Sequence, residues 1–226
     1  TPASSSQSVA ELVMGHLFAI SRFLHDSFKH MEHGDFSTLK KNYGKGVELR
    51  GKTIGILGFG RIGQSLASYA LGAGMNVVPI THTEKVFEIP VLIGNGTQVL
   101  VKLQSATMCN ETLGLLDYLS IHVPKQSNGS AVIGASEFSA MKKGIRLVNA
   151  ARGGVIDEQA LLDALANGTV AAAALDVFNN EPNPDQRLIS HPNIACTPHI
   201  GAATNEAQDR IGEELAELII GQFGRF

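Results

Sequence analysis

Cysteine is scarce in this sequence, and long apolar runs are missing. The 226 residues include two cysteines, Cys109 and Cys196. They are too few for a disulfide framework and lack metal-ligand spacing, so we expect free thiols in a reducing compartment. No apolar stretch approaches the roughly 20 residues that a membrane-spanning helix needs. The serine-rich start has neither the basic end nor the apolar run of a signal peptide. These absences predict a soluble, cytoplasmic protein with no membrane partner.

An excess of charge of either sign is missing as well. The 18 basic and 21 acidic residues give a formal net charge of -3. Without a basic cluster, the sequence lacks the electrostatic signature of a nucleic-acid-binding protein. Hydrophobic residues make up 44% and charged residues 17%, a composition typical of a folded globular chain. The length fits one large domain, and we expect its partner to be a small molecule and no nucleic acid.

Strand and helix patterns alternate along most of the chain. Apolar residues recur at helical spacing over 9–24 on more than one face, so this helix must be covered on two sides. The polar segment 25–45, broken by glycines, is predicted to be an irregular connection. Asp157 and Thr204 are expected to cap the last two helices. Further strands are predicted at 53–57, 76–80, 118–123, 145–149, 170–175 and 193–196, and helices at 62–71, 136–141, 158–166 and 205–220.

Two runs rich in Val, Leu and Ile, 86–93 and 97–103, flank the turn sequence Gly94-Asn95-Gly96, which is a strong hairpin signal. The alternation elsewhere predicts an α/β, Rossmann-type doubly wound fold with a mostly parallel sheet and an inserted β-hairpin. The hairpin either shapes the edge of a binding site or stabilises a dimer, and its residues favour neither role.

The sequence Gly58-Phe59-Gly60-Arg61-Ile62-Gly63 has the spacing G-x-G-x-x-G and lies between a predicted strand and a predicted helix. In this context, backbone N–H groups and the positive end of a helix dipole point at a pyrophosphate. The first glycine permits the tight turn, the second lets a cofactor approach the backbone, and the third lets helix and strand pack closely. A nicotinamide dinucleotide is the expected ligand, and a strand-to-helix turn without a ligand is the alternative.

The acidic residue that usually follows about 20 positions later, where it binds the adenosine ribose hydroxyls, is missing. The second strand leads into Thr81-His82-Thr83, and the nearest carboxylate is Glu84. Thr81 or Thr83 can still hydrogen-bond a ribose, whereas His82 and Lys85 can tolerate a 2′-phosphate. These residues leave the choice between NAD and NADP open.

Three further motifs follow the glycine turn: Val148-Asn149-Ala150-Ala151-Arg152-Gly153-Gly154, then Leu175-Asp176-Val177-Phe178 leading to Glu181-Pro182, then Thr197-Pro198-His199-Ile200-Gly201. Over about 8–220, apart from the hairpin, the chain resembles the D-isomer-specific 2-hydroxyacid dehydrogenase family. Within that family the phosphoglycerate dehydrogenases of serine biosynthesis are the most similar. The resemblance implies an NAD-dependent oxidoreductase that interconverts a D-2-hydroxy acid, such as 3-phosphoglycerate, and its 2-oxo acid by hydride transfer. It also favours NAD over NADP.

The resemblance implies a catalytic set of Arg152, Glu181 and His199. Reduction of a 2-oxo acid needs a proton at the carbonyl oxygen, and an imidazole, which titrates near neutrality, suits that role. Glu181 is expected to orient the imidazole and favour its charged form. Arg152 is expected to hold the substrate carboxylate in two hydrogen bonds. Taken singly, the three residues have ordinary alternatives: a surface ion pair, a solvated loop carboxylate and a structural histidine.

The resemblance also implies which residues bind the cofactor. Asp176 is expected near the nicotinamide carboxamide, with a turn cap as the alternative. His122-Val123-Pro124 is expected beside the ribose and diphosphate, although a buried strand histidine is the preferred interpretation of His122. Cys196 is expected to be a small apolar residue rather than a nucleophile, and no metal is expected. The full expected cofactor set is Gly58, Gly60, Arg61, Ile62, Gly63, Thr81, His122, Val123, Pro124, Ala150, Ala151, Arg152, Asp176, His199 and Gly201.

We expect residues 1–226 to form one NAD(P)-binding domain, with a helix and connection at 1–50, the hairpin at 84–104 and a closing helix at 204–222. Family members usually begin with a smaller domain of roughly a hundred residues that closes over the substrate. This chain starts with Thr1-Pro2, next to the first helix of the nucleotide domain. We therefore expect the substrate lobe to be absent and the isolated chain to bind dinucleotide but turn over poorly.

The first predicted helix resembles the family's two-fold dimer element and implies a homodimer. A helix simply sandwiched between sheet and loop is the alternative. Two other functions stay open on the same fold: a non-catalytic dinucleotide sensor, and a glyoxylate or hydroxypyruvate reductase.

Overall fold

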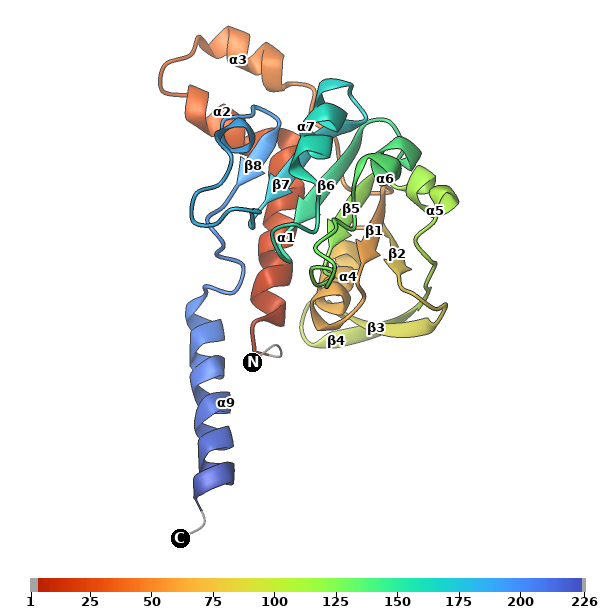
Figure 1. Cartoon of the computed structure of the whole chain (residues 1–226), viewed down its shortest axis with the longest axis vertical. Helices are drawn as coiled ribbons and strands as arrows, with labels where there is room; N and C mark the ends of the chain where they lie inside the picture. Colours follow the sequence, from red (N-terminus) through yellow and green to blue (C-terminus); the bar gives the residue numbers. More distant parts are fainter. Residues whose placement is uncertain (1–3, 225–226) are drawn as a thin grey trace.

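Six parallel strands form the central sheet of the computed structural model, which describes residues 4–224, so Thr1 and Pro2 lie outside it (Figure 1). The strand order is β2-β1-β5-β6-β7-β8. The order reverses between β1 and β5, and the crevice at such a point, outside the carboxyl ends of the strands, is where ligands bind in this class of sheet. The bounds are β1 (Thr53–Leu57), β2 (Asn76–Ile80), β5 (Tyr118–Ile121), β6 (Ile145–Asn149), β7 (Val170–Leu175) and β8 (Ile194–Cys196).

Helices cover both faces of the sheet, because successive strand residues point to opposite sides. In β7, Ala172 and Ala174 contribute to one buried hydrophobic cluster, whereas Ala173 and Leu175 contribute to the other. This arrangement confirms the predicted doubly wound fold. The first cluster is covered by α1 (Ser6–Arg22) and α4 (Arg61–Gly72), and the second by α5 (Asn110–Leu115), α6 (Ala135–Ala140), α7 (Glu158–Ala166) and α8 (Gln186–Ile189).

The predicted hairpin is also confirmed. It comprises the antiparallel strands β3 (Val86–Ile93) and β4 (Thr97–Gln104). On one face of β3, Ile89 and Val91 are buried and Phe87 is half-buried, and β3 packs against α4. The rings of Phe59 and Phe87 meet edge to face with centroids 4.7 Å apart. The hairpin is therefore anchored to the glycine turn and to the helix that follows it.

The segment 25–45 is mostly helical, so the prediction of an irregular connection was wrong. It contains α2 (Leu24–His30) and α3 (Phe36–Tyr43). Asp35 caps α3 by accepting a hydrogen bond from the Thr38 backbone N–H at 2.8 Å, which is a common way to start a helix. The glycines that suggested a connection lie outside both helices. The short helices α5 and α8 were also missed, because six and four residues are too few for a periodic pattern.

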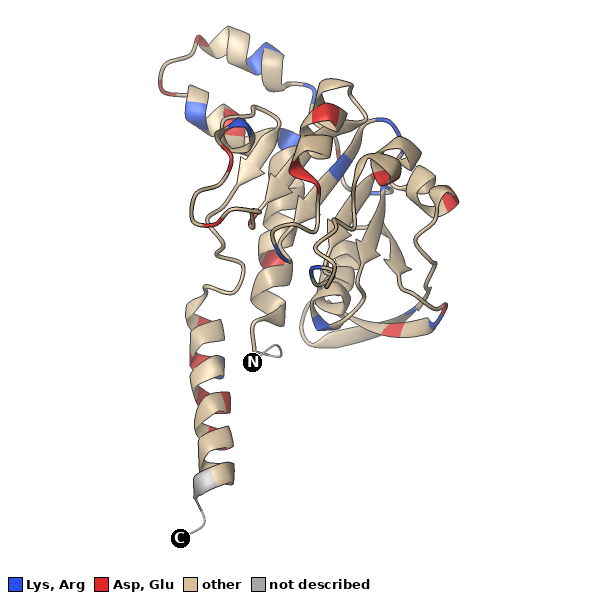
Figure 2. Cartoon of the chain, viewed as in Figure 1, with Lys and Arg blue, Asp and Glu red and all other residues tan. Residues whose placement is uncertain are grey.

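The last helix, α9 (Asn205–Phe223), projects from the domain as a separate rod (Figure 1). Thr204 caps it, as predicted, by accepting a hydrogen bond from the Ala207 N–H at 3.1 Å. Leu215 and Leu218 on this helix are more than half exposed, and acidic residues recur along it (Figure 2). Across residues 4–224, none of the helices combines the length and apolar character needed to cross a membrane.

Candidate active site

The glycine turn joins β1 to α4 and leaves the start of that helix open. Gly58 has a φ of +89°, and an added Cβ would lie 2.7 Å from the carbonyl oxygen of His122. On Gly63 an added Cβ would lie 2.6 Å from the Gly58 carbonyl oxygen, so the helix packs directly on the turn. Gly60 faces open space, with none of the described atoms within 4 Å of an added Cβ. The first N–H groups of α4 can therefore receive an anion such as a diphosphate.

A cavity of about 670 Å³ opens beside this turn, at the carboxyl ends of β1 and β2. Gly58, Thr81, Val123 and Pro124, which the sequence assigned to the cofactor, all line it. Its size and largely apolar walls suit an adenosine group. His82, which the sequence suggested could tolerate a 2′-phosphate, lines the cavity as well. Sequence reasoning assigned no cofactor role to the remaining lining residues, which are Leu57, Phe59, Ile80, Thr107, Met108, Lys125, Gln126 and Val132. Phe59 lies inside the glycine motif, whereas Met108 and Val132 belong to no recognisable motif.

The end of β2, where an acidic residue was missing from the sequence, is held by the hairpin. Thr81 Oγ1 donates to the carbonyl oxygen of Thr83 at 2.7 Å and lies 3.0 Å from Ser105 Oγ. Ser105 Oγ also accepts from the Lys85 backbone N–H at 2.8 Å. No Asp or Glu occurs among the described residues that line the cavity, and the His82 side chain, which does line it, is exposed. The described lining therefore carries no carboxylate that would repel a 2′-phosphate, and it is compatible with both NAD and NADP.

His122 lies under the glycine turn, and its side chain does not line the cavity. Its Nε2 is 2.8 Å from Ser120 Oγ. Its Nδ1 is buried and has no hydrogen-bond partner among the described residues. Burial lowers the pKa of His122 to about 4, so the imidazole is neutral near pH 7. His122 lies one residue beyond β5, so the expectation of a histidine within the strand was wrong, and its ring environment is that of a structural histidine. A direct contact with cofactor stays a prediction.

Arg152 lies in the loop 150–154, which directly follows β6. Asn149, which is buried, donates through its side-chain amide to the carbonyl oxygen of Arg152 at 3.1 Å. Gly153 lies so close to the neighbouring loop that any Cβ would collide with the carbonyl oxygen of Phe178. The backbone of this loop therefore lies against the loop that follows β7, and the exposed Arg152 guanidinium donates from Nη1 to the carbonyl oxygen of Ala151 at 2.6 Å.

His199 and Glu181 form a hydrogen-bonded pair, with His199 Nδ1 2.8 Å from Glu181 Oε2. Glu181 Oε1 accepts from the Phe178 backbone N–H at 2.9 Å. Two hydrogen bonds lower the pKa of Glu181: the bond to His199 has the larger effect and the bond to Phe178 the smaller. The positive charge of Arg152 lowers it further. An ionised Glu181 requires a proton on Nδ1 of His199, which leaves Nε2 available to exchange a proton with a substrate. The pair borders a groove of about 400 Å³.

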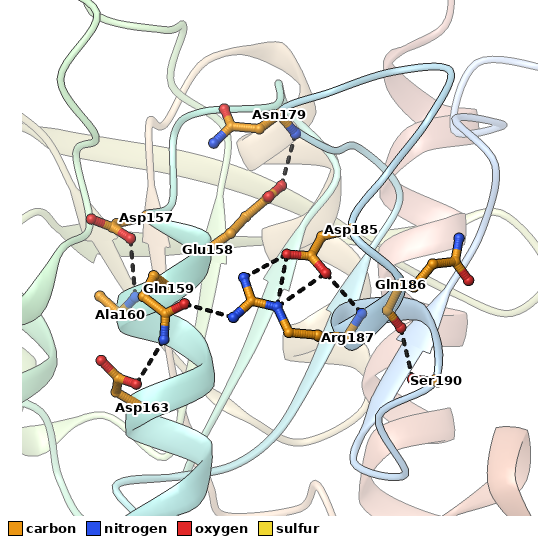
Figure 3. A network of polar contacts seen from close by, with 10 residues as sticks. All are labelled: Asp157, Glu158, Gln159, Ala160, Asp163, Asn179, Asp185, Gln186, Arg187 and Ser190. Carbon is orange, nitrogen blue, oxygen red and sulfur yellow. Dashed lines mark hydrogen bonds and ion pairs between the residues drawn. The ribbon is translucent and has the colours of Figure 1, made fainter.

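A polar network fixes the loop that carries Glu181 (Figure 3). On one side, the Asn179 backbone N–H donates to Glu158 Oε1 at 2.7 Å. On the other side, Arg187 Nη1 donates to Gln159 Oε1 at 2.8 Å. Both acceptors lie in the first turn of α7, so the loop is tied to one helix before and after Glu181.

Asp176, expected beside the nicotinamide carboxamide, is buried inside the turn 197–201. Its carboxylate accepts one side-chain hydroxyl and two backbone N–H groups of that turn, at distances of 2.6, 2.9 and 2.9 Å. His199, within the turn, has a φ of +54°. Asp176 is therefore a turn cap in this structure, and its role toward the carboxamide stays a prediction.

Cys196 lines the groove beside the Glu181–His199 pair, whereas Cys109 does not. Both are free thiols. Burial raises the pKa of Cys196 to about 11, so its thiol is protonated near neutrality and poorly nucleophilic. Within residues 4–224 there is also no cluster of His, Cys, Asp or Glu that would hold a metal ion.

The chain is similar to known proteins along most of its length. The sequence profile described as "D-isomer specific 2-hydroxyacid dehydrogenase, NAD binding domain" matches residues 14–201. A hydroxypyruvate reductase from Thermotoga maritima is 40% identical over 99% of this chain and 69% of its own length. D-3-phosphoglycerate dehydrogenase from Rattus norvegicus is 40% identical over 96% of this chain and 38% of its own length. The chain thus spans little more than a third of the rat enzyme.

A solved structure of an NADPH-dependent glyoxylate/hydroxypyruvate reductase from Sinorhizobium meliloti, in complex with NADP and malonate, superposes with a TM-score of 0.78. It is 28% identical, and the match covers 99% of this chain and 67% of that chain. The four ordered motifs, the open glycine turn and these matches agree with one another. The chain belongs to the D-isomer-specific 2-hydroxyacid dehydrogenases and is an NAD-binding domain of that family of oxidoreductases.

Proposed function

We propose that this chain supplies the cofactor and proton-transfer site of an enzyme that interconverts a D-2-hydroxy acid and its 2-oxo acid. The observation that carries the proposal is the 2.8 Å bond between Glu181 and His199. It joins a carboxylate with a lowered pKa to an imidazole at the carboxyl edge of the sheet. A structural histidine needs no such partner on a half-exposed loop.

Each residue of the set has a chemical task in this proposal. The dinucleotide, when bound, supplies or accepts the hydride. His199 gives a proton from Nε2 to the carbonyl oxygen during reduction and takes it back during oxidation. Glu181 holds the Nδ1 proton and stabilises the imidazolium. Arg152 binds the substrate carboxylate with its planar fork, which fixes the carbonyl carbon for hydride transfer.

We propose a three-carbon substrate with oxygen on C3, with 3-phosphoglycerate as the first candidate. The support comes from the two relatives at 40% identity, whose names refer to 3-phosphoglycerate and to hydroxypyruvate. Both compounds carry a carboxylate next to the reacting carbon, which is the group that Arg152 suits. Hydroxypyruvate or glyoxylate reduction is the second candidate, because the structural neighbour with NADP and malonate has that activity in its name.

A substrate panel tests the proposal. The full-length gene product is assayed with NADH and NADPH against phosphohydroxypyruvate, hydroxypyruvate and glyoxylate, alongside His199→Ala. We expect turnover of at least one acid and a loss of about 10²-fold or more in the variant. Undiminished turnover by His199→Ala would contradict the role of His199. Tight dinucleotide binding without turnover of any 2-oxo acid would favour a dinucleotide sensor instead.

We further propose that residues 1–226 act as one NAD(P)-binding domain that turns over slowly by itself. The His199 side chain is 49% exposed, whereas efficient hydride transfer favours a site from which water is excluded. Dinucleotide binding by the chain with kcat far below that of the full-length product is the expected result. Equal kcat values would refute this part of the proposal.

We also propose a homodimer formed through α1 and the two helices that follow it, α2 and α3. Large apolar side chains are exposed there, among them Phe28 at 84% and Phe36 at 68%, and clustered exposed apolar residues mark interaction surfaces. Sedimentation at micromolar concentration is expected to give a dimer for the wild type and a monomer for Phe28→Asp. The control is Leu92→Asp on the hairpin, which should remain a dimer. A monomeric wild type, or a monomer only in the hairpin variant, would refute this interface.

A further inference from the structure

A buried histidine outside the predicted catalytic set touches the turn that carries His199. His16 lies in α1, is 5% exposed, and places its Nε2 3.0 Å from Thr197 Oγ1. The same hydroxyl donates to Asp176 Oδ1 at 2.6 Å. A hydroxyl has one proton to donate, so Thr197 must accept from His16. This requirement assigns the His16 proton to Nε2.

The bonds continue from Thr197 to the rest of the turn. Asp176 Oδ1 also accepts from the Ile200 backbone N–H, and Oδ2 accepts from the Gly201 N–H, both at 2.9 Å. A buried carboxylate is stable only when donors satisfy it. All three donors that surround Asp176 here come from 197–201. The chain of contacts thus runs from α1 through one hydroxyl and one carboxylate to the two residues that follow His199.

His199 occupies a backbone conformation that needs this support. Its φ of +54° lies in the left-handed region, which a side chain with a Cβ adopts at a cost. Burial, more than any other effect, lowers the pKa of His16, although the Asp176 charge opposes the shift. His16 is therefore neutral near pH 7 and acts as a donor of one hydrogen bond, not as a second acid.

We propose that His16 is a positioning residue that acts through Thr197 and Asp176 to hold His199 in its catalytic orientation. His16 itself does not touch the substrate or cofactor in this proposal. Sequence reasoning missed it because it sits in the apolar pattern of α1 and belongs to none of the four motifs. The kinetic part of the inference rests on the proposed function, whereas the conformational part does not.

The matched variants are His16→Gln and His16→Met. Gln and Met have similar shapes, but only Gln keeps an N–H donor at about the reach of Nε2. The control is Ser21→Ala, which removes a buried hydrogen bond of 2.8 Å between Ser21 Oγ and the Tyr118 hydroxyl from the same helix. The control lowers the stability of the α1 packing without touching the turn 197–201.

Amide hydrogen exchange of Ile200 and Gly201, measured in this chain, decides the conformational part. We expect exchange to be about tenfold faster in His16→Met and within about twofold of wild type in His16→Gln and Ser21→Ala. Thr197→Val should give the same acceleration, and the double variant with His16→Met should add nothing to it. Unchanged exchange in His16→Met, or equal acceleration in His16→Gln, would overturn the inference.

Steady-state kinetics of the full-length enzyme decide the catalytic part. We expect kcat to fall about tenfold in His16→Met with the KM for dinucleotide unchanged, and to recover in His16→Gln. A rise in KM with unchanged kcat would contradict a positioning role. If the wild type turned over no 2-oxo acid, the proposed function would fail, and the exchange measurements would still test the link from His16 to the turn.

Discussion

At the scale of single residues, the contact between Glu181 and His199 matters most. Glu181→Gln keeps the size of the side chain and can still accept from the Phe178 backbone N–H, but it removes the negatively charged oxygen that lies 2.8 Å from His199 Nδ1. We expect kcat/KM to fall about 10- to 100-fold with little change in dinucleotide affinity. Glu213→Gln on α9 is the control, because that side chain is exposed and distant from the site. Equal kcat/KM in Glu181→Gln and wild type would show that the carboxylate does not assist His199.

Thr81 bears on the choice of cofactor. An acid at the end of β2 would bond the ribose hydroxyls of NAD and repel a 2′-phosphate, and none of the described cavity residues supplies one. We expect the wild type to bind NADH and NADPH within about tenfold of each other. Thr81→Asp should weaken NADPH binding by about tenfold or more relative to NADH, as measured by calorimetric titration. An unchanged ratio of the two dissociation constants would place the ribose elsewhere.

His122 makes stability depend on pH. The unfolded chain protonates this residue near its ordinary pKa of 6.5, whereas the folded chain does so only near a pKa of about 4. Between these values the unfolded state binds more protons, so the free energy of unfolding falls as pH falls, by at most about 3 kcal/mol from this group. Denaturant unfolding of His122→Met should show a shallower fall between about pH 7 and pH 4. Identical slopes in wild type and variant would contradict this assignment.

The sequence identified the residues that belong to motifs, but not the residues that hold them in place through tertiary contacts. Gly58, Arg152 and His199 could be named because their motifs occur in a recognisable order. His16 and Glu158 act on the same site through contacts across many residues of sequence. Neither belongs to a motif. A histidine in an apolar helix pattern or a glutamate at a helix start occurs in many folds, so neither residue stands out in the sequence. Such contacts depend on packing that residue spacing does not encode.

At the scale of elements, two glycines of the glycine turn have different roles: Gly63 allows close packing, and Gly60 leaves space for a ligand. Gly63→Ala places a Cβ 2.6 Å from the Gly58 carbonyl oxygen, whereas Gly60→Ala meets none of the described atoms within 4 Å. We expect Gly63→Ala to lower the free energy of unfolding by about 1–3 kcal/mol. Gly60→Ala should leave stability within about 1 kcal/mol and weaken dinucleotide binding about tenfold or more, because its methyl group lies where the diphosphate approaches. Thermal unfolding and calorimetric titration measure the two effects.

The opposite pattern would contradict this division. If Gly60→Ala unfolded more easily than Gly63→Ala and bound dinucleotide normally, the open side of the turn would not be the diphosphate site.

Prediction of the elements depended on how much local pattern each contains. The strands β1 and β7 have the predicted bounds, because each is a short apolar run between turn residues. The helices α2 and α3 were missed because glycines near them suggested a loop, although Asp35 supplied an ordinary cap signal. The projection of α9 could not be predicted either. An amphipathic pattern predicts that one face will be covered, but not by what.

At the scale of the whole molecule, the cavity beside the glycine turn and the Glu181–His199 pair lie along the same edge of the sheet. The cavity beside the glycine turn lies at the carboxyl ends of β1 and β2, and the Glu181–His199 pair lies beyond β7 and β8. The switch in strand order falls between β1 and β5. A dinucleotide laid along this edge would place its diphosphate at Gly60 and its nicotinamide toward His199. Through His16, the α1 helix contacts Thr197 in the turn that carries His199.

Mapping NADH binding by two-dimensional NMR on the isotope-labelled chain tests this placement most directly. We expect saturable shifts of the backbone amides of Gly60, Thr81, Ala151 and Gly201 in a single titration, with α9 and the hairpin tip unaffected. Shifts confined to residues away from the carboxyl edge of the sheet, or no saturable shift up to about 1 mM NADH, would contradict it.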